Sequence, residues 1–355
     1  MENICQVDKS FKVETSIDEK GLLFFDAEEE PFKIYGVFHE GDRFRRMPEN
    51  IAKSVSEGVH YLHSNTAGGR VKFITDSPYV AISVVLDKAW AMNHFAYTGV
   101  AGFDLYEKTD DGEKYRGTFR PPTANESKGY ESIIRLDGQK QREFTINMPL
   151  YTDVKKIYIG LKEGSKISAP GEYKNEKPVV YYGSSITQGA CASRPGMSYE
   201  GIIQRALDID YINLGFSGSA KGEKEIAEYI SELDMSLLVM DYDYNAPTPE
   251  HLEKTHEPLF KAVREKNPDL PVLMISHLDI FPAIGEEGKK RLEIIERTYK
   301  NAVQAGDKNV YFIDGATLFS DEIRSDATVD GCHPTDLGFF SMAKKMIPVI
   351  KDILF

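Results

Sequence analysis

Apolar and polar residues alternate with a period of two through much of residues 30–165. In REFTINM (residues 142–148) and KKIYIGL (residues 155–161) every second residue is apolar. The side chains of the apolar face are Phe144, Ile146, Met148, Ile157, Ile159 and Leu161. The residues of the other face are Glu143, Thr145, Asn147, Lys156, Tyr158 and Gly160. This alternation is typical of antiparallel strands with one buried and one exposed face.

Two Asp-Gly pairs separate these segments. Asp111-Gly112 lies between GFDLYEK and EKYRGTF, and Asp137-Gly138 lies between ESIIRL and REFTINM. Because an Asp-Gly pair between alternating segments favours a tight turn, both pairs are predicted to close hairpins. With RVKFITD and YVAISVVL added, an all-β sandwich or jelly roll is predicted over residues 1–170. A short helix is expected near residues 49–56.

The pattern changes after KISAPGEYKNEKP (residues 166–178), which is polar and contains Gly and Pro. We predict a second domain over residues 177–355. Its short apolar segments, each followed by a helical one, are PVVYYG, DYINLG, SLLVMDY, PVLMIS and NVYFIDG. Two of the helical segments have apolar faces, formed by Leu292, Ile295, Tyr299 and Ala302 and by Phe339, Ala343, Met346, Ile347 and Ile350. The alternation predicts a doubly wound α/β domain that binds ligands at the carboxyl ends of its parallel strands.

Composition and charge narrow the expected partners. The 355 residues have a formal net charge of -13, which repels phosphate backbones, so no nucleic acid partner is expected. No run approaches the roughly 18 apolar residues of a membrane span, so no membrane partner is expected either. The opening MENICQVDKS lacks the basic and apolar regions of a signal peptide, which favours a cytoplasmic location over a mature secreted form. Self-association into a homo-oligomer stays open.

The three cysteines do not form a CxxC pair or a disulfide framework, which agrees with a reducing compartment. Cys191 and Cys332 stand beside the two segments that are the strongest candidates for an active site. A bridge between them is one alternative, and two buried thiols are the favoured one.

GSSITQG (residues 183–189) follows the apolar segment PVVYYG. A serine on a sharp strand-to-helix turn presents its hydroxyl above the sheet, where backbone N–H groups can stabilise an oxyanion. The spacing differs from the G-x-S-x-G turn, because Thr187 stands where the second glycine belongs. Ser185 is therefore a candidate nucleophile, although the segment alone favours a helix cap.

Two further loops follow strands of the same domain. NLGFSGSA contains Gly218, whose backbone N–H has no side chain beside it, and DYDYNAP contains Asn245, whose amide can donate to a developing negative charge. Each also fits an ordinary turn. Tyr242 and Tyr244 are candidates to line a substrate pocket, with packing at the strand end as the alternative.

The last such loop, VDGCHPTDLGF, places Asp330 three residues before His333. A serine nucleophile needs a base for its proton, and an imidazole needs a partner on Nδ1 that leaves Nε2 facing the hydroxyl. The serine turn, the two donor loops and this Asp-His pair all follow strands of one α/β domain. They are therefore predicted to meet at one edge of the sheet.

Together, GSSITQG, Gly218, Asn245 and DGCHP resemble the four signature blocks of the SGNH, or GDSL-type, hydrolases. GFDLY (residues 102–106) is similar to the signature of a β-rich domain that precedes one branch of that family. The resemblance implies a flavodoxin-like three-layer α/β/α domain after the β-domain, and a serine esterase with no cofactor and no metal. It implies a nucleophile at Ser185, an acid/base at His333, an orienting carboxylate at Asp330, and oxyanion-hole donors at Ser185, Gly218 and Asn245.

The resemblance also implies a substrate class, because many family members with an accessory β-domain remove acetyl groups from xylan or its oligosaccharides. The expected partner is an ester-bearing small molecule or oligosaccharide. The alternatives are a lipase or lysophospholipase, against which the absence of an amphipathic lid argues, and a catalytically inactive glycan-binding protein. Trp90 is a candidate sugar-stacking platform, with a core position as the favoured alternative. His251 and His256 are five residues apart and do not share a helix face, which argues against a metal site there.

Overall fold

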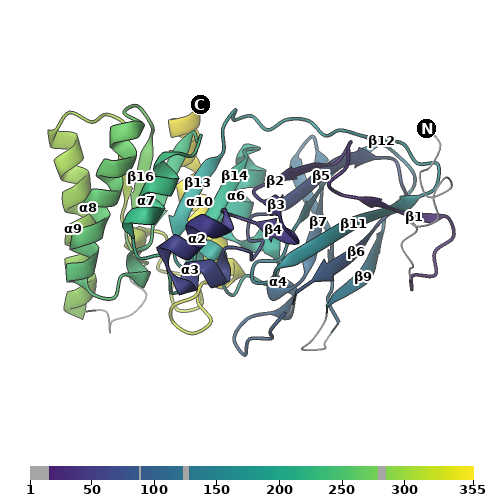
Figure 1. The fold of residues 1–355 in the computed structure, drawn as a ribbon, viewed down its shortest axis with the longest axis horizontal. Coiled ribbons are helices and arrows are strands. Elements are labelled where there is room, and N and C mark those ends of the chain that lie inside the picture. Colours follow the sequence, from purple (N-terminus) through teal and green to yellow (C-terminus); the bar gives the residue numbers. More distant parts are fainter. Residues whose placement is uncertain (1–15, 88, 123–127, 279–284) are drawn as a thin grey trace.

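The computed structural model describes residues 16–87, 89–122, 128–278 and 285–355. An antiparallel β-region and an α/β region with a parallel sheet lie side by side, as Figure 1 shows with the β-region at the right. Residues 169–178 connect the two regions. The expected fold class, an all-β region followed by a flavodoxin-like α/β region, is confirmed.

Two antiparallel sheets form the β-region. The first has the strand order β1 (Leu22–Asp26), β11 (Val154–Lys162), β6 (Tyr79–Leu86) and β9 (Gly129–Arg135). The second has the order β12 (Ile167–Ser168), β5 (Arg70–Thr75), β10 (Arg142–Asn147), β7 (Phe103–Thr109) and β8 (Gly112–Phe119), with β2 (Lys33–Tyr35) also paired to β5. A separate pair consists of β3 (Phe38–Glu40) and β4 (Arg43–Arg45).

The inner faces of these sheets form one apolar core, so the region is a sandwich. The predicted apolar faces of β10 and β11 lie in it: Phe144, Ile146, Met148, Ile157, Ile159 and Leu161 are all 1% exposed or less. The alternation of the sequence is therefore confirmed for the inner faces. The Asp111-Gly112 turn is confirmed as well, because Thr109 pairs with Gly112 at the end of the β7–β8 hairpin.

The hairpin expected at Asp137-Gly138 is wrong. Strand β9 pairs with β6 in the first sheet, whereas β10 pairs with β5 and β7 in the second. Gly138 does take a left-handed φ of 67°, so the chain turns where the sequence indicates. A turn residue reverses the chain locally, but packing of the two sheets decides which strand becomes the partner.

The alternation predicts an exposed outer face for the second sheet, but this face is buried. Thr145 and Asn147 are 2% and 4% exposed, and the Asn147 amide donates to Asp104 of β7 at 2.7 Å. Asp104 also accepts from Arg194 Nη1 and from the Gly196 N–H, both at 2.9 Å and both in the α/β region. This polar face is buried because it docks on the second domain. Asp104 and its neighbour Tyr106, which contacts the same guanidinium, belong to the GFDLY segment.

Arg70 of β5 strengthens the same interface. Its guanidinium is fully buried, pairs with Asp210 and donates to the Tyr211 carbonyl at 3.1 Å. It also lies 4.1 Å from the centre of the Tyr211 ring. Charged and aromatic contacts of this kind fix the β-region against the edge strand of the parallel sheet.

Two short helices of the N-terminal half pack on the other domain. Helix α2 (Glu49–Val55), which confirms the helix expected near residues 49–56, lies beside α7 (Lys224–Ser231) in Figure 1. Helix α3 (Glu57–Leu62) packs on α2, and its Val59 and Leu62 join the same apolar core. Just before α2, the buried Arg46 guanidinium donates to the Gly215 carbonyl at 2.6 Å. The N-terminal half thus reaches the end of a strand of the α/β region.

The parallel sheet has the order β14 (Tyr211–Gly215), β13 (Val179–Gly183), β15 (Leu237–Asp241), β16 (Val272–Ile275) and β17 (Val310–Ile313). Its first strand along the chain, β13, lies second in the sheet, which is the flavodoxin-like 2-1-3-4-5 order. Alternate residues of β13 serve two cores: Val179 and Tyr181 face one side, and Val180 and Tyr182 face the other. The strand order reverses at β13, so its carboxyl end is the expected ligand site.

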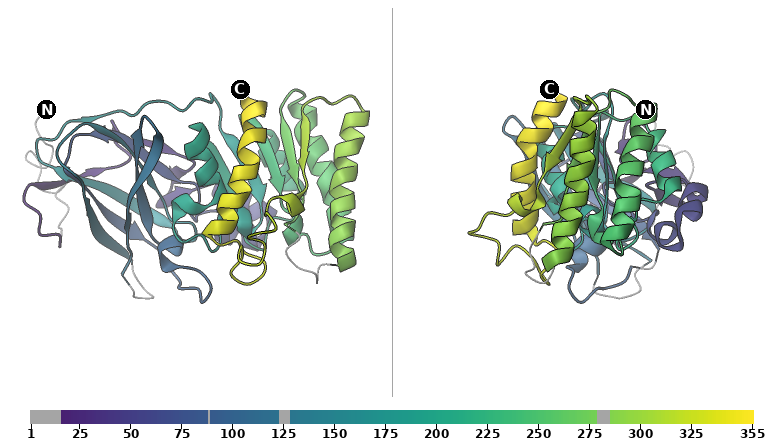
Figure 2. Two further views of the ribbon diagram at one scale, coloured as in Figure 1. Left: turned by 180° about the vertical axis from the view of Figure 1, so that it is seen from behind. Right: turned by 90° about the vertical axis from the view of Figure 1, so that its left-hand side faces the viewer.

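Helices cover both faces of the sheet. One face carries α6 (Tyr199–Leu207) and α10 (Asp336–Leu354), and the other carries α7, α8 (Pro249–Lys266) and α9 (Gly285–Gln304). Figure 2 shows α10 from behind, in yellow, in front of this face of the sheet. The predicted helix faces are confirmed by the burial of Ile295, Ala302, Phe339, Ala343, Met346 and Ile350.

The remaining helices of the described residues are short. They are α4 (Tyr97–Val100), α5 (Ser185–Gln188), η2 (Pro195–Met197), η3 (Asp243–Asn245) and η4 (Gly315–Thr317). Three of them, α5, η3 and η4, follow the carboxyl ends of β13, β15 and β17. Within the described ranges, no helix combines the length and the apolar character that crossing a membrane requires.

Candidate active site

Ser185 is the first residue of α5, directly after the end of β13. Ser184 takes the N-cap position, where its hydroxyl accepts from the Ile186 N–H at 3.1 Å. The two serines therefore have different roles: Ser184 caps the helix, and the Ser185 hydroxyl is left for other partners. Residues 179–192 are all buried except Ser185. The turn thus exposes one hydroxyl at the carboxyl end of the central strand.

Gly183 makes this turn tight. A Cβ at that position would lie 2.0 Å from Thr187 Oγ1 and 2.4 Å from the Asp241 carbonyl oxygen. Any side chain would therefore push α5 away from β15. Thr187 in turn donates to the buried Asp241 carboxylate at 3.2 Å, which holds α5 against the sheet.

The structure brings Ser185 together with the Asp-His pair. The Ser185 Oγ lies 2.9 Å from His333 Nε2, although the two residues are 148 positions apart in the chain. His333 Nδ1 lies 2.7 Å from Asp330 Oδ2. The three side chains form a continuous hydrogen-bonded chain that can pass a proton from the serine to the imidazole.

Asp330 is fixed by its own loop. Burial acts to raise the pKa of its carboxyl, but hydrogen bonds from the backbone and ring of His333 and from the Cys332 N–H outweigh burial and lower the pKa to about 2. The carboxylate is therefore ionised near neutral pH and accepts the Nδ1 proton. The lone pair of His333 Nε2 is then directed at the Ser185 hydroxyl.

Gly218 and Asn245 lie on adjacent loops. The Asn245 amide donates to the Phe216 carbonyl at 2.9 Å, which joins the end of η3 to the loop after β14. The neighbouring Ser217 N–H donates to Gln188 of α5 at 3.0 Å. Gly218 has φ of 67° and open space where a side chain would stand. An Asn amide has two N–H donors, so one remains after the bond to Phe216.

Tyr242 is not a pocket residue. It is 1% exposed, its hydroxyl donates to Thr255 at 3.0 Å, and its ring stacks on His256 in the core beneath α8. The prediction that Tyr242 lines the substrate pocket is wrong, because its side chain points to the covered face of the sheet. Tyr244 is partly buried and its hydroxyl accepts from the Leu278 N–H at 3.2 Å. Its role toward a substrate stays a prediction.

The Asp243 side chain is also bonded within the protein. Its carboxylate, 1% exposed, accepts from the backbone N–H of His277 at 3.0 Å and contacts the His277 ring at 3.1 Å. His277 is thus a buried histidine with its polar groups bonded within the protein. Asn245, the last residue of η3, has the side chain that bonds to the loop of Gly218.

Both halves of the chain match known families. Residues 176–351 match the GDSL-like Lipase/Acylhydrolase family, and residues 22–167 match the N-terminus of SGNH-hydrolase-type esterases. A protein described as a GDSL-like lipase from Bacteroides ovatus is 30% identical, with a TM-score of 0.84, over 94% of this chain and 98% of that chain. The chain belongs to the SGNH, or GDSL-like, hydrolase family.

Two other solved structures share the fold of this hydrolase at lower identity. The salicylyl-acyltransferase SsfX3 from a tetracycline biosynthetic pathway is 16% identical with a TM-score of 0.76, over 94% of this chain and 98% of that chain. The acetyl xylan esterase Est2A from Butyrivibrio proteoclasticus is 12% identical with a TM-score of 0.57, over 93% and 98%. A search of curated proteins gives no significant match.

A polar cleft of about 1010 Å³ opens beside the active site of the hydrolase and is formed by the N-terminal half. Two aromatic side chains on its wall are strongly exposed, Trp90 at 53% and Tyr61 at 69%. The core position favoured for Trp90 from the sequence is therefore wrong. The other lining residues are mainly charged or otherwise polar: Asp42, Arg43, Arg45, Glu49, Glu57, His60, His63, Asp87 and Asp153.

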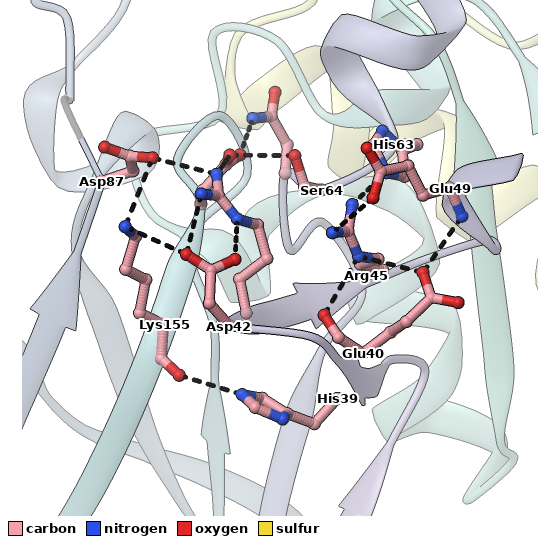
Figure 3. Close-up of polar contacts among 12 residues, drawn as sticks. His39, Glu40, Asp42, Arg45, Glu49, His63, Ser64, Asp87 and Lys155 are labelled. Atoms are coloured by element: carbon pink, nitrogen blue, oxygen red, sulfur yellow. Dashed lines mark hydrogen bonds and ion pairs between the residues drawn. The ribbon is translucent and has the colours of Figure 1, made fainter. Parts of the chain in front are cut away.

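Hydrogen bonds and ion pairs hold the charged side chains of the cleft in place (Figure 3). Arg43 Nη1 lies 2.9 Å from Asp87 and 2.8 Å from Asp153. Arg45 donates to His63 Nε2 at 2.5 Å. Burial lowers the pKa of His63 to about 4, so its ring is neutral near pH 7 and can accept this bond. The floor of the cleft is a preorganised set of donors and acceptors.

Two residues join this cleft to the active site. The Tyr151 hydroxyl, on the cleft wall, lies 3.4 Å from the Ser185 carbonyl oxygen. Asn65, also on the wall, accepts from the Gln188 side chain of α5 at 3.1 Å. The N-terminal half thus contributes walls directly beside the helix that carries Ser185.

The sequence reasoning missed His94. Its ring centre lies 5.7 Å from that of His333, and it stands on the loop between β6 and α4 that also supplies Trp90 and Met92 to the cleft. The sequence contains one indication of this loop: Trp90, Met92 and His94 stand at every second position in a segment between two predicted strands. It could not indicate a position at the active site, because only domain docking brings this loop to His333.

Cys191 and Cys332 are free thiols. Burial, together with the charge of Asp330, raises the pKa of Cys191 to about 12 and that of Cys332 to about 11. Both are therefore protonated near neutral pH and poor nucleophiles. Cys191 and Cys332 do not form a disulfide, so the favoured prediction of two thiols is confirmed.

Proposed function

We propose that this hydrolase removes a small acyl group, most simply acetyl, from a hydroxyl of a carbohydrate through an acyl-enzyme intermediate. The observation that carries the proposal is the continuous contact from Asp330 through His333 to Ser185. The serine hydroxyl is partly exposed, so an ester can approach it. The geometry needs neither movement nor a further group to activate the serine.

The reaction has two steps. The Ser185 Oγ attacks the acyl carbonyl carbon while His333 Nε2 takes its proton, and the imidazolium then protonates the oxygen of the departing alcohol. Water attacks the resulting ester of Ser185, gives its proton to His333, and the serine leaves with that proton as the acid product is released. Asp330 remains a carboxylate and stabilises the imidazolium in both steps.

The oxyanion of each tetrahedral intermediate would be bound by three N–H groups. These are the backbone N–H groups of Ser185 and Gly218 and the free N–H of the Asn245 amide. The bond from Asn245 to Phe216 and that from Ser217 to Gln188 fix the two donor loops relative to α5 before substrate binds. Such preorganised donors stabilise developing charge without reorganisation.

The cleft supports a carbohydrate as the alcohol part. Exposed aromatic rings such as Trp90 and Tyr61 can stack on the apolar face of a sugar, while the fixed charged groups below can bond to hydroxyls. Carboxylates outnumber guanidinium groups on the wall, which disfavours an anionic substrate. The fold shared with an acetyl xylan esterase agrees with this substrate class.

A lipase or lysophospholipase is the second candidate. Each methylene of a long acyl chain gains about 0.8 kcal/mol only when it is buried in apolar surroundings, and most of the side chains that line the cleft are charged or polar. A series of aryl esters tests this directly. A rate that peaks at acetyl or propionyl agrees with our proposal, whereas a rate that peaks at eight or more carbons would favour lipids.

The nucleophile is tested with Ser185→Ala. We expect no turnover of an aryl acetate and no labelling by a fluorophosphonate probe, with unchanged circular dichroism and melting temperature. Ser184→Ala is the matched control, because it removes the adjacent hydroxyl and costs about 1 kcal/mol of capping but leaves the labelled serine. Full activity of Ser185→Ala, or failure of the wild-type protein to react with the probe, contradicts the proposal; the latter would favour an inactive glycan-binding protein.

The cleft is tested with Trp90→Ala and Tyr61→Ala. Loss of one stacking contact worth about 0.5–1.5 kcal/mol should raise KM for acetylated xylo-oligosaccharides about 2- to 13-fold and leave aryl acetate hydrolysis unchanged. Phe340→Ala is the control, since Phe340 is 52% exposed on α10 and does not line the cleft. Equal effects on both substrates would remove the cleft from the proposal.

A further inference from the structure

Three metal-ligating side chains meet at the active site: His94, Cys191 and His333. One ligand atom from each lies within 4.8 Å of the other two. They come from three separate segments: the loop before α4, the turn after α5, and the loop before α10. Sulfur and imidazole nitrogen are the donors that Zn²⁺ prefers in proteins.

Both histidines have a ring nitrogen left for a metal. His333 uses Nδ1 for Asp330, which leaves Nε2 on the side of the serine. The Nδ1 of His94 lies 3.0 Å from the Asn93 side-chain oxygen, which leaves its Nε2. A bond at the second nitrogen is what orients and fixes the tautomer of a metal-binding histidine.

Cys191 has an unusual backbone. Its φ is 73°, in the left-handed region that residues with a side chain rarely adopt. Two positions before it, Gly189 serves the same turn with φ of 93°. Strain of this kind at a residue with a side chain points to a function for that side chain. The turn directs the buried Cys191 thiol to the histidines of the active site.

We propose that His94, Cys191 and His333 form a Zn²⁺ site that reversibly inhibits the enzyme. Ligand atoms of a tetrahedral zinc ion are about 3.3–3.6 Å apart, given bonds of roughly 2.0–2.3 Å. The separations are at most 4.8 Å, so closing them takes shifts on the order of 1 Å shared among the three side chains, of which His94 is the most exposed. Three protein ligands leave a fourth position for water or the Ser185 hydroxyl.

Inhibition follows from the atom that the metal binds, His333 Nε2, and this step rests on the proposed function. The lone pair of His333 Nε2 that accepts the serine proton would be donated to Zn²⁺ instead. On binding, the Cys191 thiol releases its proton to solvent and coordinates as a thiolate, with no change of oxidation state. Removal of the metal by a chelator restores the base.

Metal binding can be measured without any esterase activity. The Ser185→Ala protein, freed of metal with a chelator and dialysed, is titrated with Co²⁺ as an optical probe and then with Zn²⁺ in competition. We expect one equivalent of Co²⁺, a thiolate-to-cobalt charge-transfer absorption, and displacement by Zn²⁺. Loss of this absorption in a Cys191→Ser background is expected. An absent signal, or one that survives Cys191→Ser, overturns the site.

Inhibition is measured on the otherwise wild-type chain with an aryl acetate, each variant being compared with its own rate in chelator. His94→Ala should weaken inhibition by Zn²⁺ at least about tenfold. Mutation of a residue that only hydrogen-bonds to a metal ligand already lowers metal affinity by about 10- to 100-fold, and His94 would be a ligand itself. Cys332→Ser and His60→Ala are matched controls, because they remove a nearby thiol and a cleft histidine outside the cluster. Equal zinc sensitivity of His94→Ala and wild type overturns the proposal, as does a loss of sensitivity in Cys332→Ser.

The two proposals fail in distinguishable ways. Stoichiometric, Cys191-dependent metal binding to a protein that hydrolyses no ester would keep the metal site and end the esterase. Hydrolysis with no metal binding at micromolar Zn²⁺ would keep the esterase and end the metal site.

Discussion

Asp104 of the β-region, which is fully buried, and Arg194 of the α/β region, which is partly buried, form an ion pair across the interface of the two regions. The Arg194 Nη1 lies 2.9 Å from Asp104 Oδ2, and the Asp104 side chain is fully buried. Arg194 lies nine residues after Ser185, in the segment that leads from α5 to α6. The pair therefore ties the β-region to the segment directly behind the active-site helix.

Asp104→Ala should destabilise the protein strongly. It leaves the partly buried Arg194 guanidinium, the Gly196 N–H and the Asn147 amide without their acceptor, and removal of one partner of a buried pair costs about 3–5 kcal/mol. Chemical denaturation followed by fluorescence and circular dichroism measures the loss. Asp111→Ala is the control, because its side chain is 83% exposed at the end of the β7–β8 hairpin. Equal stability of the two variants would mean that Asp104 does not hold the interface.

Asp330→Asn should reduce kcat by up to about 10⁴-fold with little change in KM, because an amide that donates to Nδ1 favours the tautomer with the proton on Nε2, which cannot accept the Ser185 proton. Initial-rate kinetics with an aryl acetate measure the change in kcat and KM. The pKa of Asp330 is lowered to about 2, so this carboxylate stays ionised as the pH falls from 8 to 4. A decline of activity measured in that range would therefore come from another group. A rate within tenfold of wild type would show that the orientation of His333 does not depend on Asp330.

Asn245→Ala should lower kcat by about 10²- to 10³-fold if its amide is an oxyanion donor. The bond to Phe216 is lost as well, which costs about 1 kcal/mol and must be separated from catalysis by a melting curve. Asn301→Ala is a suitable control, because Asn301 bonds to Glu257 on the exposed side of α8 and α9. A near-normal kcat in Asn245→Ala would transfer the donor role to a neighbouring group.

Stability should fall as the pH drops from about 6.5 toward 4. Burial lowers the pKa of His256 to about 4, against an ordinary value near 6.5 in the unfolded chain. Between these values the unfolded state binds the additional proton, so the contribution is fully present above pH 6.5 and is lost on acidification. His63, with a pKa also lowered to about 4, acts in the same direction.

Urea midpoints at pH 7.5, 6.5, 5.5 and 4.5 measure this dependence. His256→Phe retains a ring to stack on Tyr242 but cannot be protonated, so its midpoints should fall less between pH 6.5 and 4.5 than those of wild type. Above pH 6.5 the two proteins should show parallel curves. Parallel curves over the whole range would remove His256 as a source of acid sensitivity.

The sequence by itself determined the elements and the chemistry of the active-site loops. The period-two and helical patterns identify the strands of both regions because burial of one face is a local property of each segment. Ser185, Asp330 and His333 could be found because each follows a strand of one parallel sheet, and such sheets gather their carboxyl ends at one edge. Asp330 and His333 are also three residues apart, so their contact needs little of the fold.

The tertiary structure alone decided what depends on docking. Strand β10 pairs in a different sheet from β9, the polar face of β7 and β10 is buried by the second domain, and Trp90 is exposed at a cleft. Tyr242 and Tyr244 stand two residues apart and look alike in the sequence, yet only Tyr242 is fully buried in the core under α8. His94 reaches His333 across the two regions. These contacts join segments that are far apart in the chain, and their free energy depends on surfaces that exist only after both domains have folded.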